Sequence, residues 1–198
     1  MPRFDWAERL PINEDRLTVR LRMLEGEDLA MVERVASFLA WQRQPVERTD
    51  TQVVTLFKEI VPVASENPSL MAMIESRMNE RTIMAALRRR SRGMNAPTPG
   101  EEWGVGSWVQ HIERNWEDPD FKLGTVLPWV PQARQYLETG ETLALERLLM
   151  TLVWQRVDRV LENNPFGFEV VLAYLFKWDI LKRWLSYDRD AARERFDN

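Results

Sequence analysis

The sequence contains no cysteine and a single histidine, His111. The missing cysteines exclude a disulfide framework, a thiolate nucleophile and any zinc or iron–sulfur site with cysteine ligands. One histidine excludes every site within this chain that needs two imidazoles. Because Trp108, Ile112 and Trp116 place His111 on a predicted helix face, we expect a structural histidine, with no catalytic role and no metal.

Long hydrophobic runs are also missing. The most apolar stretch, 166–176, contains Glu169 and is far shorter than the roughly 20 residues that a membrane-spanning helix needs. Residues 1–6 lack the apolar core of a secretory signal. These absences predict an intracellular, cytoplasmic chain that meets a membrane only indirectly or peripherally, at its inner face.

Motifs for nucleotide binding and nucleophilic catalysis are missing as well. There is no Walker A motif and no G-x-S-x-G motif, and the glycine-rich piece 104–107 lacks the lysine of a phosphate loop. The acidic segment 117–120 lacks calcium-ligand spacing and predicts a solvated turn. We therefore predict no catalytic residues, no cofactor, no metal and no small-molecule ligand. An enzyme that uses paired carboxylates stays an alternative, because the 31 acidic residues form many accidental pairs.

The composition is that of a soluble globular protein. Of the 198 residues, 44% are hydrophobic and 29% are charged, which excludes general disorder. The formal net charge of −4 argues against a dedicated nucleic-acid-binding domain. The 9 tryptophans are spread along the chain and predict core or interface positions.

Apolar residues at helical spacing, interrupted by proline and glycine, predict an all-α fold, an irregular helical bundle. The predicted helices lie near 13–24, 28–42, 50–61, 68–92, 107–116, 128–137, 141–163 and 166–185. Residues 17–23 also alternate in polarity, so a strand is the competing interpretation there. Pro62 is predicted to end the third helix.

The last two predicted helices form a long hairpin, because a short corner at 163–165 joins them. Tyr174, Trp178 and Leu181 share one face of the final helix and are predicted core residues. We expect one helical domain over 1–198. A glycine- and proline-rich hinge or exposed loop at 93–106 would separate 1–92 from 107–198.

Five arginines and no acidic residue occur between positions 81 and 100, and these candidate partner-binding residues are Arg81, Arg88, Arg89, Arg90 and Arg92. One interpretation is a helix C-terminus with solvated cations that complement the helix dipole. The other is a docking surface for an acidic protein or for lipid headgroups. A nucleic-acid site is the weakest interpretation.

The segment 164–185 (NPFGFEVVLAYLFKWDILKRWL) resembles the last helix of the C subunit of V/A-type ATPases. The residues that match the family pattern are Gly167, Glu169, Leu172, Ala173 and Tyr174. The segment 79–88 (NERTIMAALR) is similar to a polar-then-apolar helix of the same family. The tryptophan-rich last helix is most similar to a mostly bacterial branch associated with V-type ATPases, although this chain is shorter than a typical three-part C subunit.

This resemblance implies a non-enzymatic, C-subunit-like adaptor between the central stalk and the membrane rotor ring of a V/A-type ATPase, in proton or sodium transport. Its implied partners are the other subunits of that ATPase. Two alternatives stay open: a helical protein-binding module or assembly factor for another partner, and the carboxylate-based enzyme.

Overall fold

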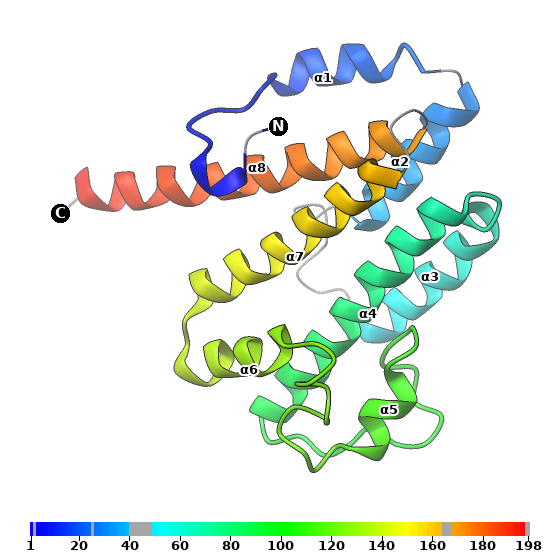
Figure 1. The fold of residues 1–198 in the computed structure, drawn as a ribbon, viewed down its shortest axis with the longest axis vertical. Helices are drawn as coiled ribbons and strands as arrows, with labels where there is room; N and C mark the ends of the chain where they lie inside the picture. The colour runs from blue at the N-terminus through cyan, green and yellow to red at the C-terminus, as the bar shows by residue number, and fades with distance from the viewer. Residues whose placement is uncertain (2, 25, 40–48, 164–167, 197–198) are drawn as a thin grey trace. The chain divides into compact units, whose positions relative to one another are not determined.

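The computed structural model of the protein describes residues 1, 3–24, 26–39, 49–163 and 168–196. Within these residues every regular element is a helix. In chain order they are the short 3-10 helix η1 (Phe4–Trp6), α1 (Glu14–Leu21), α2 (Gly26–Leu39), α3 (Asp50–Ala64), α4 (Pro68–Ser91), α5 (Val109–Arg114), α6 (Trp129–Thr139), α7 (Thr142–Asn163) and α8 (Phe168–Phe196) (Figure 1). The predicted all-α class is confirmed. The alternative of a strand over 17–23 is wrong, because α1 occupies most of that segment.

The chain divides into two compact units. The first consists of Met1–Val46 and Trp154–Asn198, and the second of Glu47–Val153. The first unit therefore contains η1, α1, α2, the end of α7 and α8, while the second contains α3 to α6 and the start of α7. The loop 93–106 lies inside the second unit, and its expected role as a hinge stays a prediction.

Helix α8 is the central element of the first unit, because η1 and α2 both pack against it. Its buried side chains include Leu172, Ala173, Ile180 and Leu181. The ring of Phe4 in η1 lies 5.3 Å from the ring of Trp184, in an edge-on geometry. These contacts cover part of the surface of α8, which continues past its predicted end at residue 185.

Helices α7 and α8 are in contact within the first unit, as the predicted hairpin requires. The ammonium group of Lys177 donates a hydrogen bond to the carboxylate of Asp158 and lies 4.8 Å from the centre of the Trp154 ring. Lys177 is buried, so this pairing supplies the partner that a buried cation needs. The centre of the predicted corner, 164–165, lies outside the described residues.

The predicted core face of α8 is confirmed at two of its three residues. Leu181 and Trp178 are buried, and the Trp178 indole N–H donates to the carbonyl oxygen of Ile12 at 2.9 Å. Tyr174 is only half-buried, so the prediction of a core tyrosine is wrong. Spacing places Tyr174 on the same stripe as Trp178 and Leu181, but it does not show how far neighbouring elements cover each position.

Helix α4 is the central element of the second unit, where α3, α5 and α6 pack against it; α3 and α4 run side by side in Figure 1. Its start is as predicted: Asn67 accepts a hydrogen bond from the backbone N–H of Leu70 at 2.9 Å, and Pro68 is the first helical residue. Gly93 follows its end with a φ of 71°, a conformation that glycine tolerates without strain.

Helix α3 passes through Pro62, where the sequence predicted its end. A proline lacks its own N–H donor, so near the last turn it removes one helical hydrogen bond. A later bond of the same turn is intact, because the backbone N–H of Ser65 donates to the carbonyl of Val61 at 2.9 Å. Thr49 and Gln52 form a reciprocal cap at the opposite end, which fixes where the helix begins.

Replacement of Trp178 by alanine should destabilise the protein by about 3–5 kcal/mol, because it empties a buried ring site and removes the hydrogen bond to Ile12. The matched control is Trp6→Ala, since the Trp6 side chain is 75% exposed; its cost should stay below about 1 kcal/mol. Chemical denaturation measures both. Equal losses for the two variants would contradict the burial of this face.

Candidate functional site

The predicted arginine run lies at the C-terminal end of α4. Arg88, Arg89 and Arg90 occupy the last turn and Arg92 is the C-cap residue. Arg88 and Arg92 are exposed, whereas Arg89 and Arg90 are half-buried, as is Arg81 two turns earlier in the helix. The structure therefore separates the run into cations that face solvent and cations that contact the protein.

Arg89 and Arg90 hold neighbouring loops against α4. The guanidinium of Arg89 donates to the carboxylate of Glu101 at 2.7 Å. That of Arg90 donates to the carbonyl oxygens of Trp116 and Glu117. These roles were not expected from the sequence, because the partners are 12 to 27 residues away. Of the five arginines, Arg88 and Arg92 are the two whose side chains are exposed.

The carboxyl of Glu101 has a pKa below its ordinary value. The largest cause is the hydrogen bond from Arg89, followed by one from the backbone N–H of Thr98, while burial acts in the opposite direction. Both contacts favour the ionised form. The loop 98–101 is thus tied to α4 by a charge that persists at neutral pH.

A second set of contacts fixes the next part of this loop on α4. The buried hydroxyl of Thr82 donates to the carbonyl of Val105 at 2.7 Å and accepts from the N–H of the same residue at 3.0 Å. Further along the loop, the side-chain oxygen of Asn79 accepts from the N–H of Ser107 at 2.9 Å. Thr82 and Asn79 belong to the segment 79–88 that resembles a helix of the V/A-type ATPase family.

Gly106 lies between these two contacts and adopts a φ of 99°. A Cβ atom at this position would lie 2.1 Å from the Asn79 oxygen that holds Ser107. Only glycine therefore fits the close approach of the loop to α4.

His111 and the acidic turn have structural contacts. The His111 Nε2 atom lies 2.9 Å from the carbonyl oxygen of Phe121, which can only accept, so Nε2 carries the proton. Asp118 accepts from the backbone N–H groups of Lys122 and Asp120, and these bonds hold the pKa of its carboxyl below the ordinary value. The described residues contain no group of three or more His, Asp or Glu side chains that could hold a metal ion.

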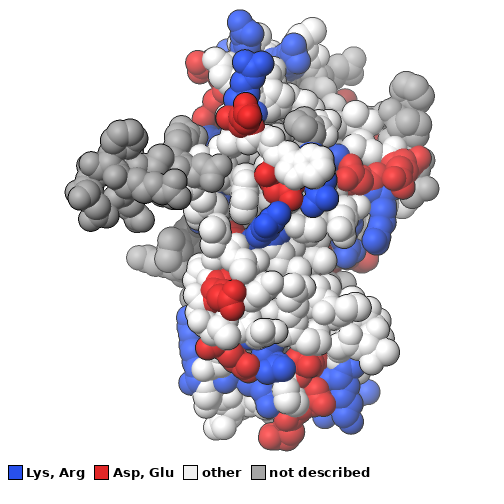
Figure 2. All heavy atoms as spheres, turned by 60° about the vertical axis from the view of Figure 1, so that its left-hand side comes forward, with Lys and Arg blue, Asp and Glu red and all other residues white. Residues whose placement is uncertain are grey.

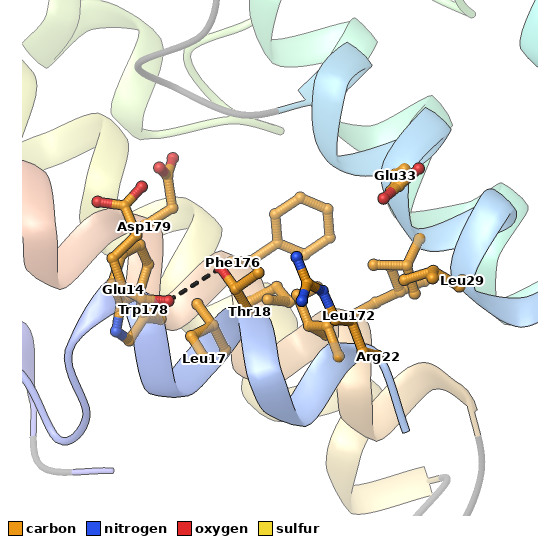
Figure 3. A pocket seen from close by; sticks show the side chains of 13 residues that line it. Glu14, Leu17, Thr18, Arg22, Leu29, Glu33, Leu172, Phe176, Trp178 and Asp179 are labelled. Atoms are coloured by element: carbon orange, nitrogen blue, oxygen red, sulfur yellow. Dashed lines mark hydrogen bonds between the residues drawn. The ribbon is translucent and has the colours of Figure 1, made fainter. Parts of the chain in front are cut away.

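A pocket of about 330 Å³ lies between α1, α2 and α8 in the first unit (Figure 3). Its buried lining consists of Leu17, Val32, Leu172 and Trp178. Half-buried side chains form its walls, namely Leu21, Leu29, Leu175 and Phe176. Charged side chains line it as well, and these are Glu14, Arg22, Glu33 and Asp179.

This pocket was not expected from the sequence. Its residues come from three helices, and the apolar ones have the spacing of ordinary core positions. One sequence feature pointed to it: the first half of α8 is apolar on nearly every side. A helix that packs through one face needs apolar residues on that face only.

One face of the molecule carries charges of both signs (Figure 2). On the face drawn in Figure 2, Lys and Arg side chains are interspersed with Asp and Glu side chains, and neither sign covers a continuous area. None of the described helices is both long and apolar enough to cross a bilayer.

Replacement of Arg90 by glutamine should destabilise the protein by about 1–2 kcal/mol, because two carbonyl oxygens lose a charged donor. The double variant Arg88→Gln/Arg92→Gln removes two charges from the same helix end and should change the free energy of unfolding by less than about 0.5 kcal/mol. Urea denaturation compares them. A double variant as unstable as Arg90→Gln would show that all these arginines serve the fold.

Gly106→Ala should destabilise by about 2 kcal/mol, through a strained φ and the displaced Asn79 side chain. Gly100→Ala is the control, because Gly100 has a similar φ of 87° but no described heavy atom within 4 Å of the added Cβ. When Asn79 is also replaced by alanine, the loss of unfolding free energy caused by Gly106→Ala should fall to that caused by Gly100→Ala. Urea denaturation measures these losses. If Gly106→Ala destabilises equally with and without Asn79, then contact with Asn79 is not the reason for a glycine at position 106.

A comparison with family models finds one match, over residues 64–198, to the family described as "Protein of unknown function (DUF2764)". The comparisons with curated proteins and with solved structures give no match. The matched region covers α4 to α8, including both the loop contacts of α4 and the central helix of the first unit. Because the match spans more than half of the chain, this protein belongs to the DUF2764 family.

Proposed function

We propose that this protein is a non-enzymatic adaptor, similar to the C subunit of V/A-type ATPases, that connects the central stalk with the membrane rotor ring. The observation that carries the proposal is the similarity of segment 164–185 to the last helix of that family. Most of the segment belongs to α8, on which η1 and α2 pack.

An adaptor that passes torque needs side chains that are held in place. Three contacts of α8 meet this requirement within the first unit. The Trp178 indole bonds to Ile12 at 2.9 Å, the Lys182 ammonium pairs with Glu14 at 2.7 Å, and Lys177 pairs with Asp158. Of the matching residues, Leu172 and Ala173 are buried in the same unit, and Leu172 also lines the pocket between α1, α2 and α8.

The exposed cations at the end of α4 supply a docking surface. Arg88 and Arg92 are exposed, and the proposal assigns them to an acidic surface of another ATPase subunit. Exposed charges at an interface mainly accelerate the encounter and are screened beyond about 10 Å at 0.1 M salt. Capture of the partner should therefore weaken as salt rises.

A helical protein-binding module or assembly factor for another partner is the second candidate. The pocket between α1, α2 and α8 supports it, since an apolar cavity with charged margins is suited to a protein side chain. No observation in the described residues favours a carboxylate-based enzyme.

The test is affinity capture of the full chain from cells that contain its natural partners, with quantification of the central-stalk and ring subunits. We expect subunits of both classes to be recovered at low salt, and recovery to fall severalfold for Arg88→Gln/Arg92→Gln. The matched control, Arg9→Gln/Arg16→Gln, removes two exposed charges from the other unit and should leave recovery unchanged.

Absence of all ATPase subunits from the captured material at every salt concentration would overturn the adaptor proposal. Equal recovery by the two double variants would instead retain the adaptor and exclude the arginine surface as its docking site. The two failures are thus distinguishable.

A further inference from the structure

We propose that the loop 94–101 and the exposed arginines Arg88 and Arg92 form one docking surface for an acidic protein, which contacts the side chain of Met94. Arg89 is the positioning residue that holds this loop in its binding conformation. The inference rests on the arginine docking surface of the proposed adaptor and adds to it an apolar contact and a fixed loop. All of these residues belong to the second compact unit.

Arg89 closes the loop by binding both of its ends. Its backbone carbonyl accepts a hydrogen bond from the N–H of Met94 at 3.0 Å. Its guanidinium donates to the carboxylate of Glu101 at 2.7 Å. One residue of α4 therefore holds the first and the last residue of the loop. A segment that is held in this way has fewer conformations to lose when a partner binds, so less entropy opposes the binding.

Further contacts fix the second half of the loop. The Glu101 carboxylate accepts from the backbone N–H of Thr98 at 3.0 Å, and the backbone N–H of Glu101 donates to the carbonyl of Thr98 at 2.9 Å. Pro97, in the middle of the loop, is buried. A loop whose ends are close together and whose own side chains hold its shape is suited to recognition.

The closed loop exposes apolar groups next to the cations. The Met94 side chain is 46% exposed, and Ala96 and Pro99 are exposed as well. Met94 follows Arg92 by only two residues, so the apolar and the cationic parts adjoin. Methionine is enriched at protein interfaces, because its flexible thioether side chain adapts to the shape of a partner. The surface therefore combines charges that accelerate encounter with a group that gains from burial.

Charge sets the sign of the partner. Arg88 and Arg92 lie four residues apart, a spacing that places them on one side of the helix end. No acidic residue occurs between positions 81 and 100. The next two acids in the chain are already in ion pairs, Glu101 with Arg89 and Glu102 with Lys58. An anionic partner complements this surface and a cationic one is repelled.

A protein fits this surface better than a lipid bilayer or a nucleic acid. An anionic bilayer is a wide plane of negative charge. Arg90 holds the backbone of Glu117, an exposed acid, at the same helix end, so such a plane would approach this acid as well as the arginines. A protein can confine its carboxylates to the positions opposite Arg88 and Arg92. The formal net charge of −4 further opposes a nucleic acid.

The experiment places the photoreactive amino acid benzoylphenylalanine at position 94 of the full chain, in cells that contain its natural partners. After irradiation, mass spectrometry identifies the protein that is cross-linked and the peptide that carries the link. We expect one main product, linked through a peptide rich in Asp and Glu, and its yield should fall severalfold in the Arg88→Gln/Arg92→Gln variant. The control carries the same amino acid in place of Val126, which is 64% exposed in the same unit, and should not give this product.

The variant Glu101→Gln tests the positioning role of Arg89. It removes a negative charge, so charge alone would leave the binding of an acidic partner unchanged or make it stronger. It also replaces a charged acceptor of Arg89 and Thr98 by a neutral one, which weakens closure of the loop. We expect the cross-link yield at position 94 to fall about twofold to fivefold, with cooperative unfolding retained. The control Glu102→Gln removes the adjacent exposed acid, which pairs with Lys58 instead, and should not lower the yield.

Each outcome decides between the alternatives. A product with a central-stalk or ring subunit supports both this inference and the adaptor. A product with another protein, linked through an acidic peptide and dependent on both arginines, retains the docking surface and overturns the assignment to an ATPase. Recovery of ATPase subunits by affinity capture without any cross-link at position 94 retains the adaptor and overturns the inference.

Three further results would overturn the inference alone. The first is the same product from positions 94 and 126, and the second is a yield that Glu101→Gln leaves unchanged or raises. The third is co-sedimentation of the chain with anionic phosphatidylserine vesicles that depends on both arginines, because it would assign the surface to a bilayer.

Discussion

The packing of shorter elements against one long helix is the constraint on which each compact unit depends. In the first unit that helix is α8, and in the second it is α4. A chain without disulfides has to obtain its stability from apolar burial, and a long helix offers several faces for that burial. Both helices accordingly bury residues around much of their circumference, including Thr82 and Glu80 in α4 and Lys177 in α8.

Buried polar side chains then decide which loops and helices attach to these central elements. Thr82 satisfies both backbone groups of Val105, and Lys177 has Asp158 as its partner. Each of these hydrogen bonds requires a defined geometry, whereas apolar packing alone tolerates alternative arrangements of the side chains. Gly106 completes the arrangement, because the loop can approach Asn79 only where no Cβ intervenes. The loop 93–106 thus combines a first half that is exposed apart from the buried Pro97 with a second half anchored at Trp103 and Val105.

The two proposed interaction sites differ in chemistry and belong to different units. Arg88 and Arg92 are solvent-exposed cations at a helix end, suited to an acidic surface and sensitive to salt. The pocket beside α8 combines an apolar interior with charged side chains of both signs.

The sequence by itself determined the helical class, most helix starts and a buried face of α8 that includes Trp178 and Leu181. Those properties depend on local spacing and capping, as at Asn67 and Pro68, and local rules act within one or two turns. Only the tertiary structure decided that Arg89 and Arg90 bind loops, that Tyr174 is half-buried and that three helices enclose a pocket. Each of these outcomes depends on which residues distant in the chain meet, and neither periodicity nor composition encodes the partner of a side chain 12 to 27 residues away.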